Sequence, residues 1–229
     1  MIYLEKINLI KQKNNILDDI SITFQEKQIT SIIGPNGGGK SSLLKIIMSL
    51  IKPNSGTVIF SRKDINISYM PQKLTMQSNF MPISVSDFLN IYTNKIDCND
   101  IINLLPPKVY SFFFEYGQDK QINTLSHGQF QFLLLLRCLM RKADLFILDE
   151  PESFLDIKHK NIVAQLFNHL KNIGKTIIIA SHDLYVIAKY TDNVICLNKK
   201  IHCKNISKNK QDIKKINDDF ILFDHDYHE

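Results

Sequence analysis

Long apolar runs are missing from this sequence of 229 residues. Runs such as Phe132 to Leu136 and Leu145 to Leu148 fall far short of the roughly 20 residues that a membrane-spanning helix needs. The first residues include the acidic Glu5 and lack a basic region followed by an apolar core, so they do not resemble a secretory signal. We therefore expect a cytosolic protein that does not cross a membrane.

Arginine is scarce as well, although the chain is basic. Only three of its 28 basic residues are Arg, and with 23 acidic residues the net charge is +5. Recognition of bases and phosphates favours the bidentate Arg fork, so we expect no nucleic-acid partner. With 44% hydrophobic and 22% charged residues, the composition is that of a folded protein with a sizeable core rather than a disordered chain.

The sequence also contains no C-x-x-C pair. Its four cysteines are Cys98, Cys138, Cys196 and Cys203. Since disulfides are rare in the cytosol, we expect these cysteines to serve as packing residues.

Apolar periodicity indicates an α/β fold. Residues Ile20 to Phe24 alternate between apolar and polar side chains, which predicts an antiparallel start. Continuous apolar runs at Ile29 to Ile33, Leu145 to Leu148 and Thr176 to Ala180 are typical of strands buried on both faces of a parallel sheet. The core sheet is therefore predicted to be mostly parallel and doubly wound, with an antiparallel β subdomain at the amino end.

Helices and short strands are predicted between the buried strands. We predict helices over Ser41 to Ile51, Ser126 to about Arg141 and Lys158 to Ile173, and strands over Thr57 to Phe60 and Ile65 to Met70. Residues from about 72 to 125 are predicted to form a small helical subdomain inserted in one domain of residues 1–198. Residues 199–229, first basic and then acidic, are predicted to form a tail.

The strongest motif is a glycine-rich phosphate loop between a predicted strand and a predicted helix. It matches G-x-x-x-x-G-K-[ST] and comprises Gly34, Pro35, Asn36, Gly37, Gly38, Gly39, Lys40 and Ser41, followed by Ser42. Backbone N–H groups and the helix N-terminus would bind the phosphates, and Lys40 would neutralise the β- and γ-phosphates. Ser41 would ligate Mg²⁺.

Two carboxylates, Asp149 and Glu150, end the apolar run at residues 145–148. The carboxyl end of a central parallel strand is where ligands of such sheets bind. Asp149 would belong to the Mg²⁺ shell, and Glu150 would polarise an attacking water. Together with the phosphate loop, this pair predicts hydrolysis of a phosphoanhydride.

In this order, the motifs resemble the ATP-binding cassettes of ABC transporters, which are P-loop NTPases. Between the two nucleotide motifs, residues 125–129 read LSHGQ and resemble the family signature LSGGQ, with His127 in place of the first glycine. The resemblance implies that ATP and Mg²⁺ bind and that two copies pair head to tail. Ser126, Gly128 and Gln129 of one copy would then close over the ATP held by the other.

Three single residues match further motifs of this family. Gln72, after Pro71, resembles the Q-loop residue that contacts Mg²⁺ and water. Asp156 resembles the D-loop aspartate, although Phe154 replaces a small residue. His182, after a predicted strand, resembles the switch histidine that contacts the γ-phosphate. The implied catalytic residues are Glu150, His182 and Lys40.

The adenine site departs from the family pattern. Ile10 and Lys11 occupy the place where the family usually carries an aromatic residue that stacks on adenine. Aliphatic packing is therefore expected to hold the base.

Shorter segments resemble the zinc-uptake cassettes of the family. They are Pro71 to Leu74, Met81 to Leu89, Val194 to Asn198, Ile201 to Cys203 and Phe223 to His228. The resemblance implies a peripheral protein on the cytoplasmic side of the inner membrane. Its implied partners are an integral permease, contacted through Gln72 and residues such as Phe80, Met81 and Phe88, and indirectly a metal-binding protein. The same apolar residues could equally form the core of the helical subdomain.

Several alternatives stay open. The cargo could be manganese, iron or an exported molecule, or the chain could be a soluble cassette. It could also be a weakly hydrolysing scaffold, because His127 and Phe154 depart from the family pattern. Metal binding by His225 and His228 is a minor alternative to a polar terminus.

Overall fold

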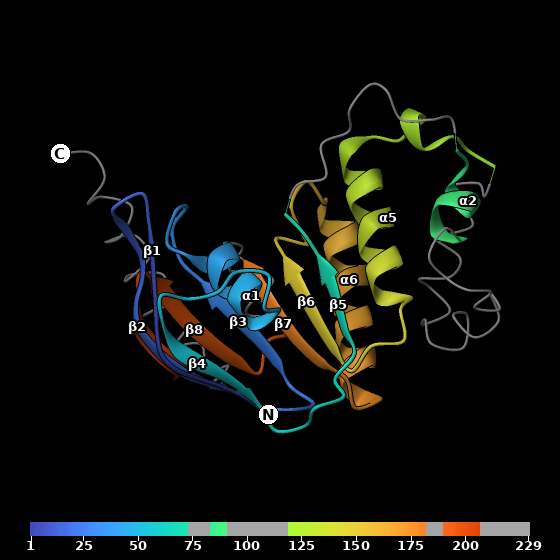
Figure 1. The fold of residues 1–229 in the computed structure, drawn as a ribbon. Helices are drawn as coiled ribbons and strands as arrows, with labels where there is room; N and C mark the ends of the chain where they lie inside the picture. The colour runs from blue at the N-terminus through green and yellow to red at the C-terminus, as the bar shows by residue number, and fades with distance from the viewer. Residues whose placement is uncertain (73–82, 91–118, 182–189, 207–229) are drawn as a thin grey trace.

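A computed structural model of the chain describes residues 1–72, 83–90, 119–181 and 190–206 (Figure 1). The amino-terminal part forms a three-stranded antiparallel sheet of order β2-β1-β4, made of β1 (Ile2–Lys11), β2 (Asn14–Phe24) and β4 (Ser55–Phe60). Ile20, Ile22 and Phe24 are buried while the residues between them are not, so the predicted alternation is confirmed.

The core is a six-stranded sheet of order β5-β6-β7-β3-β8-β9. Its strands are β3 (Ile29–Ile33), β5 (Ile67–Met70), β6 (Leu145–Asp149), β7 (Thr176–Ser181), β8 (Asn193–Asn198) and β9 (Lys200–Ile206). Four neighbouring pairs are parallel, and only β8 and β9 are antiparallel. Every residue of β3, β6 and β7 is buried, as the continuous apolar runs predicted.

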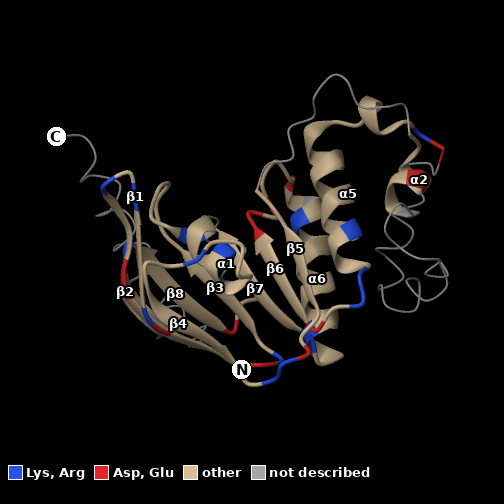
Figure 2. Cartoon of the chain, viewed as in Figure 1, with Lys and Arg blue, Asp and Glu red and all other residues tan. Residues whose placement is uncertain are grey.

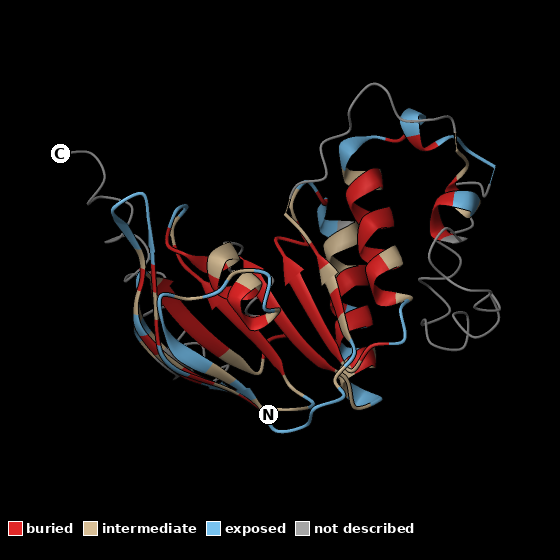
Figure 3. Cartoon of the chain, viewed as in Figure 1, coloured by how far each residue is buried: buried red, intermediate tan, exposed pale blue. Residues whose placement is uncertain are grey.

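Helices cover both faces of the core sheet (Figures 1 and 3). The described helices are α1 (Lys40–Ile47), α2 (Val85–Asn90), the 3₁₀ helix η1 (Ile122–Thr124), α5 (His127–Leu139) and α6 (Ile157–Asn172). Apolar side chains of α1 pack between the two sheets, in one hydrophobic cluster with β1, β2 and β8. Those of α5 and α6 form a second cluster on the opposite face. None of the described helices is both long and apolar enough to cross a bilayer.

Helix α1 is shorter than predicted. We predicted a helix from Ser41 to Ile51, but α1 ends at Ile47 and Met48 is its C-cap. Ser49 then adopts a left-handed conformation, with a φ of 58°, and Leu50 is 63% exposed. The N–H groups of Ser49 and Leu50 donate to the carbonyls of Ile46 and Lys45, at 2.9 and 2.8 Å, so a Schellman motif ends the helix although the apolar spacing continues.

The carboxyl part of the sheet also differs from expectation. We began a tail at residue 199, whereas residues 200–206 form β9 and pair with β8. The same pairing brings Cys196 and Cys203 together, with Cα atoms 4.9 Å apart, and they form a disulfide. The prediction that these two cysteines merely pack was therefore wrong, because the hairpin makes them register partners at a Cα separation that a disulfide can bridge. Cys138, by contrast, is a buried free thiol.

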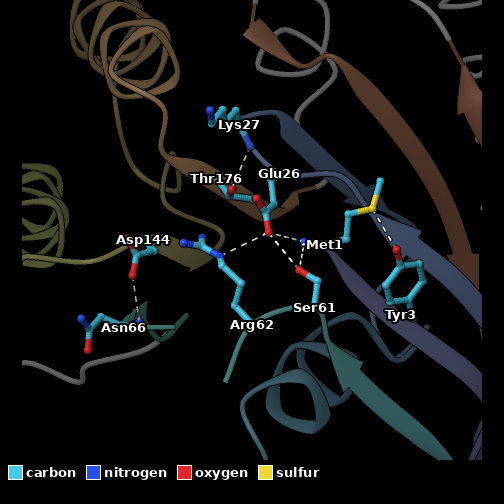
Figure 4. A network of polar contacts seen from close by, with 9 residues as sticks. All are labelled: Met1, Tyr3, Glu26, Lys27, Ser61, Arg62, Asn66, Asp144 and Thr176. Atoms are coloured by element: carbon cyan, nitrogen blue, oxygen red, sulfur yellow. Dashed lines mark hydrogen bonds and ion pairs between the residues drawn. The ribbon is translucent and has the colours of Figure 1, made fainter. Parts of the chain in front are cut away.

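A polar network joins the two sheets at the amino ends of the core strands (Figure 4). The amino group of Met1 contacts the Glu26 carboxylate and donates to Ser61 Oγ at 2.7 Å. Ser61 Oγ in turn donates to Glu26 Oε1 at 3.0 Å, and the hydrogen bonds from Met1 and then Ser61 lower the pKa of Glu26. The backbone N–H of Lys27 donates to Thr176 Oγ1 at 2.9 Å. The network fixes the edge of the sheet opposite to the phosphate loop.

Candidate nucleotide site

The phosphate loop follows β3 and leads into α1, as the motif predicted. Gly39 is the N-cap of α1 and has a φ of 96°, a left-handed conformation that favours glycine. The Lys40 ammonium donates to the carbonyl oxygens of Gly34, at 2.6 Å, and Pro35, at 3.0 Å. The first turn of α1 has no acidic residue, so its N-terminal N–H groups keep a positive potential suited to an anion.

Neighbouring backbone encloses this loop. A Cβ atom on Gly34 would lie 1.8 Å from the carbonyl oxygen of Leu197, in β8. A Cβ atom on Gly39 would lie 2.7 Å from Leu17 Cδ2. The N–H of Lys199, in the turn between β8 and β9, donates to the Gly38 carbonyl at 2.9 Å. These close approaches explain why glycine is needed here.

Asp149 and Glu150 lie at the same edge of the sheet as the loop, because β6, β7 and β3 are adjacent and parallel. Figure 2 shows the acidic end of β6 and the basic residues of α1 at this edge. Both carboxylates and Lys40 are buried. Burial lowers the pKa of Lys40, and the charges of Glu150 and Asp149 partly offset this effect.

The Asp149 carboxylate has the surroundings of a cation ligand. Its Oδ1 is buried and has no hydrogen-bond partner among the described residues. Burial raises the pKa of this carboxyl, and the nearby Ser41 hydroxyl partly lowers it. The pairing of Met70 with Leu148 places Gln72 at the same edge, just beyond β5. Carboxylate, hydroxyl and amide oxygens suit Mg²⁺, so the residues present fit this ion.

Glu150 is held in an unusual conformation. Its φ is 52°, in the left-handed region that non-glycine residues rarely adopt. Its N–H donates to the Ala180 carbonyl at 2.9 Å, and its own carbonyl accepts from Gln131 Nε2 at 3.2 Å. Ser153 Oγ donates to Glu150 Oε2 at 3.2 Å. Strand β7 and helix α5 therefore hold the backbone of Glu150, and Ser153 of the same loop contacts its carboxylate.

Gln131 and Ser153 were not predicted from the sequence. Gln131 is buried, and it is a polar residue inside the otherwise apolar run of residues 130–136. That break in the run was a usable signal. Ser153 offered none, because a serine in a loop is common.

The signature segment and the D-loop contact each other. Ser126 is the N-cap of α5 and forms a capping box with Gln129, with distances of 3.2 and 3.0 Å. A Cβ atom on Gly128 would lie 2.6 Å from the carbonyl oxygen of Phe154. The rings of His127 and Phe154 are 6.0 Å apart. In Figure 1, α5 and α1 lie on opposite sides of β5 and β6.

Asp156 begins α6 and stabilises its first turn. Its carboxylate accepts from the backbone N–H of His159 at 2.8 Å and lies 2.6 Å from His159 Nδ1. The Asp156 side chain is exposed.

Of the remaining predicted residues, one is buried in the core and the others lie outside the residues that the structure describes. Phe88 is buried, with its ring 6.0 Å from that of Phe130 and 4.4 Å from the guanidinium carbon of Arg137, so it belongs to the hydrophobic core. His182, Phe80, Met81, His225 and His228 lie outside the described residues. Within the described residues, no group of three or more His, Cys, Asp or Glu side chains could hold a metal ion.

Replacing Asp149 by Asn is expected to stabilise the nucleotide-free protein. Burial raises the pKa of Asp149, so its ionised form opposes folding and its loss should raise the melting temperature by about 2–4 °C. The stabilisation should be largest above the raised pKa of Asp149 and should shrink as the pH falls through that pKa, because Asp149 is then protonated in the folded wild type. Thermal unfolding of wild type and Asp149→Asn, followed by circular dichroism at neutral and at acidic pH, measures the difference in melting temperature.

The exposed Asp64 provides the control for this substitution. Asp64→Asn removes the same charge without changing a buried group, and it should leave the melting temperature nearly unchanged at either pH. A lower melting temperature for Asp149→Asn at neutral pH would mean instead that attraction to Lys40 outweighs the cost of burial.

Comparison with known proteins adds independent observations. The family described as ABC transporter matches residues 17–153, a range that includes the phosphate loop and Glu150. Zinc import ATP-binding protein ZnuC of Ehrlichia canis (strain Jake) is 35% identical and aligns over 93% of this chain and 88% of its own length. The protein of the same name from Rickettsia bellii (strain RML369-C) is 38% identical over 86% and 83%. A solved dimeric ATP-binding cassette in a post-hydrolysis state, bound to ADP and Pi, has a TM-score of 0.71, with 22% identity over 91% of this chain and 99% of its own.

Proposed function

The chain belongs to the ABC transporter family, and from this premise we propose that it is the ATP-hydrolysing subunit of an importer of divalent metal, with zinc as the cargo. The observation that carries the proposal is the convergence of Lys40, Ser41, Asp149 and Glu150 at one edge of the sheet, behind a loop shaped for phosphate. The zinc assignment draws on the curated relatives, whose printed name is that of zinc import proteins.

The chemistry follows from the positions of these side chains. Lys40 and the N–H groups of the loop bind the phosphates and offset their charge. Glu150 accepts a proton from a water molecule and aligns it for in-line attack on the terminal phosphorus, with His182 as a second contact. Asp149, Ser41 and Gln72 would hold Mg²⁺, which supplies positive charge next to the phosphate oxygens when it is bound.

The active unit is proposed to be a head-to-tail dimer. Helices α5 and α1 lie on opposite sides of β5 and β6 (Figure 1), which supports a role for Ser126, Gly128 and Gln129, at the start of α5, in the site of another copy. The exposed Asp156 follows Phe154, whose carbonyl oxygen approaches Gly128, by two residues. The solved cassette of similar fold is itself dimeric, which supports this arrangement.

The partners of this dimer are proposed from the same premise. An integral permease would hold it on the cytoplasmic side of the inner membrane, and a separate metal-binding protein would deliver the cargo to the permease. Gln72, at the sheet edge beside Asp149, would couple movement of the permease to the nucleotide site. In this scheme the chain hydrolyses ATP and need not contact zinc.

The proposal is tested by measuring total cellular zinc, manganese and iron in a strain that lacks the gene, under mild metal limitation. The strain is complemented with the wild type or with Glu150→Gln. Restoration of zinc by the wild type alone, with the other two metals unchanged, is the expected result. Restoration of manganese or iron instead would overturn the cargo, and no change in any metal with either version would overturn the transport function.

A further inference from the structure

The disulfide of Cys196 and Cys203 joins the two strands of the β8–β9 hairpin. The two residues are register partners, and the register shifts on both sides of Cys196. Regular ladder hydrogen bonding is therefore interrupted where the covalent bond lies. Cys196 is buried, while Cys203, on the edge strand β9, is partly exposed. The partly exposed Cys203 is therefore the sulfur of this disulfide that a small thiol would reach first.

The same hairpin forms one wall of the phosphate loop. Leu197, directly after Cys196, places its carbonyl oxygen against Gly34, where even a Cβ atom would not fit. The N–H of Lys199 donates to the Gly38 carbonyl at 2.9 Å. On its other side, the Lys199 carbonyl accepts from the N–H of Asp18 at 2.8 Å. A shift of the hairpin would therefore be transmitted directly to the loop that binds phosphate.

We propose that the Cys196–Cys203 pair is a redox-modification site whose oxidation state sets the affinity of the phosphate loop for nucleotide. In the disulfide form, the cross-link keeps Leu197 and Lys199 against the loop and preorganises it. In the dithiol form, only the interrupted ladder of hydrogen bonds holds the hairpin. The phosphate loop therefore samples more conformations, and ordering it on nucleotide binding costs more entropy. The disulfide form is the tighter binder.

The chemistry is ordinary thiol–disulfide exchange with a small thiol or dithiol as the reductant. One thiolate of the reductant attacks a sulfur of the pair and gives a mixed disulfide, and the other cysteine leaves as a thiolate. A second thiolate then releases the first cysteine. Two electrons pass from the reductant, which becomes a disulfide, and the two cysteine sulfurs take up two protons.

Cys138 provides a cysteine in the same chain that should not respond. It is buried in α5, and its Sγ lies 3.2 Å from Ser68 Oγ. Burial raises its pKa to about 11, so it stays a protonated, unreactive thiol near neutral pH. Redox dependence that requires Cys203 but not Cys138 would therefore be specific to the hairpin.

The experiment titrates Mg·ADP into the purified full chain by calorimetry, once after mild oxidation and once after treatment with a dithiol reductant. ADP avoids turnover during the measurement. Free thiols are counted in parallel, and the oxidised form should show two fewer than the reduced form. We expect reduction to raise the Kd for Mg·ADP by about threefold to tenfold. Cys138→Ala should respond in the same way.

The partly exposed Cys203 supplies the decisive variant. Cys203→Ser should bind Mg·ADP with the weaker affinity of the reduced wild type under both conditions. Equal affinities of the oxidised and reduced wild type, equal thiol counts, or a redox response that persists in Cys203→Ser would each overturn the inference. Nucleotide binding that is insensitive to redox state leaves the proposed function intact, whereas no Mg·ADP binding in either form overturns both.

Discussion

Glu150→Gln is expected to lower the rate of ATP hydrolysis by about 10²–10⁴-fold, the usual contribution of a general base. The amide keeps the size of the side chain and can still accept from Ser153 Oγ, but it cannot take a proton from water. Nucleotide binding should persist, because Lys40 and the phosphate loop are unchanged. Single-turnover hydrolysis, together with a separate measurement of Mg·ATP binding, distinguishes the two effects.

Glu152 is the matched control for this variant. It is a buried carboxylate on the same loop, and its Oε1 accepts from Ser181 Oγ. Glu152→Gln makes the same chemical change two residues away, and we expect it to affect stability more than the rate per folded molecule. If Glu150→Gln retained wild-type hydrolysis, or if both variants lost it equally, Glu150 would not be the base.

Gly34→Ala is expected to destabilise the fold by about 3 kcal/mol, at the upper end of the usual cost of overpacking. The new Cβ atom would meet the Leu197 carbonyl oxygen at 1.8 Å, a distance that forces the β8–β9 hairpin or the loop to move. For a domain of this size, the melting temperature should fall by about 6–12 °C. Affinity for Mg·ADP should fall as well, because the same loop binds the phosphates.

Gly37→Ala is the control that introduces backbone strain without a steric clash. A Cβ atom on Gly37 would have no neighbour within 4 Å, but its φ of 80° is in the left-handed region. Its cost should therefore be about 1–2 kcal/mol, from strain alone. Equal losses of stability in the two alanine variants would show that the hairpin yields easily and that strain dominates at both positions.

Much of the nucleotide site could be predicted because its residues depend on local patterns. The continuous apolar runs identified β3, β6 and β7 correctly, and the carboxyl end of β6 placed Asp149 and Glu150 beside the phosphate loop. The loop itself lies between a strand and a helix, as its spacing required. These features follow from residues that are close together in the sequence.

The features that were missed depend on contacts between distant segments. Gln131 holds the Glu150 carbonyl, and the Leu197 carbonyl contacts Gly34, but no local spacing links either pair. The disulfide of Cys196 and Cys203 depends on the β8–β9 hairpin. The predicted boundary at residue 198 falls within that hairpin and separates the two cysteines. Likewise, α1 ends at the left-handed conformation of Ser49, which the spacing of the apolar residues does not reveal.

The strand order has a consequence for synthesis on the ribosome. Strand β3, which leads into the phosphate loop, pairs with β7 and β8, and its Ile29 lies opposite Ile177. Both neighbours are translated long after β3. At a synthesis rate of about 5–20 residues per second, β3 stays without its partner strands for several seconds or more. The phosphate loop is thus among the earliest motifs to leave the ribosome and among the last to take shape. During that interval its apolar strand needs protection from aggregation, which a chaperone can supply.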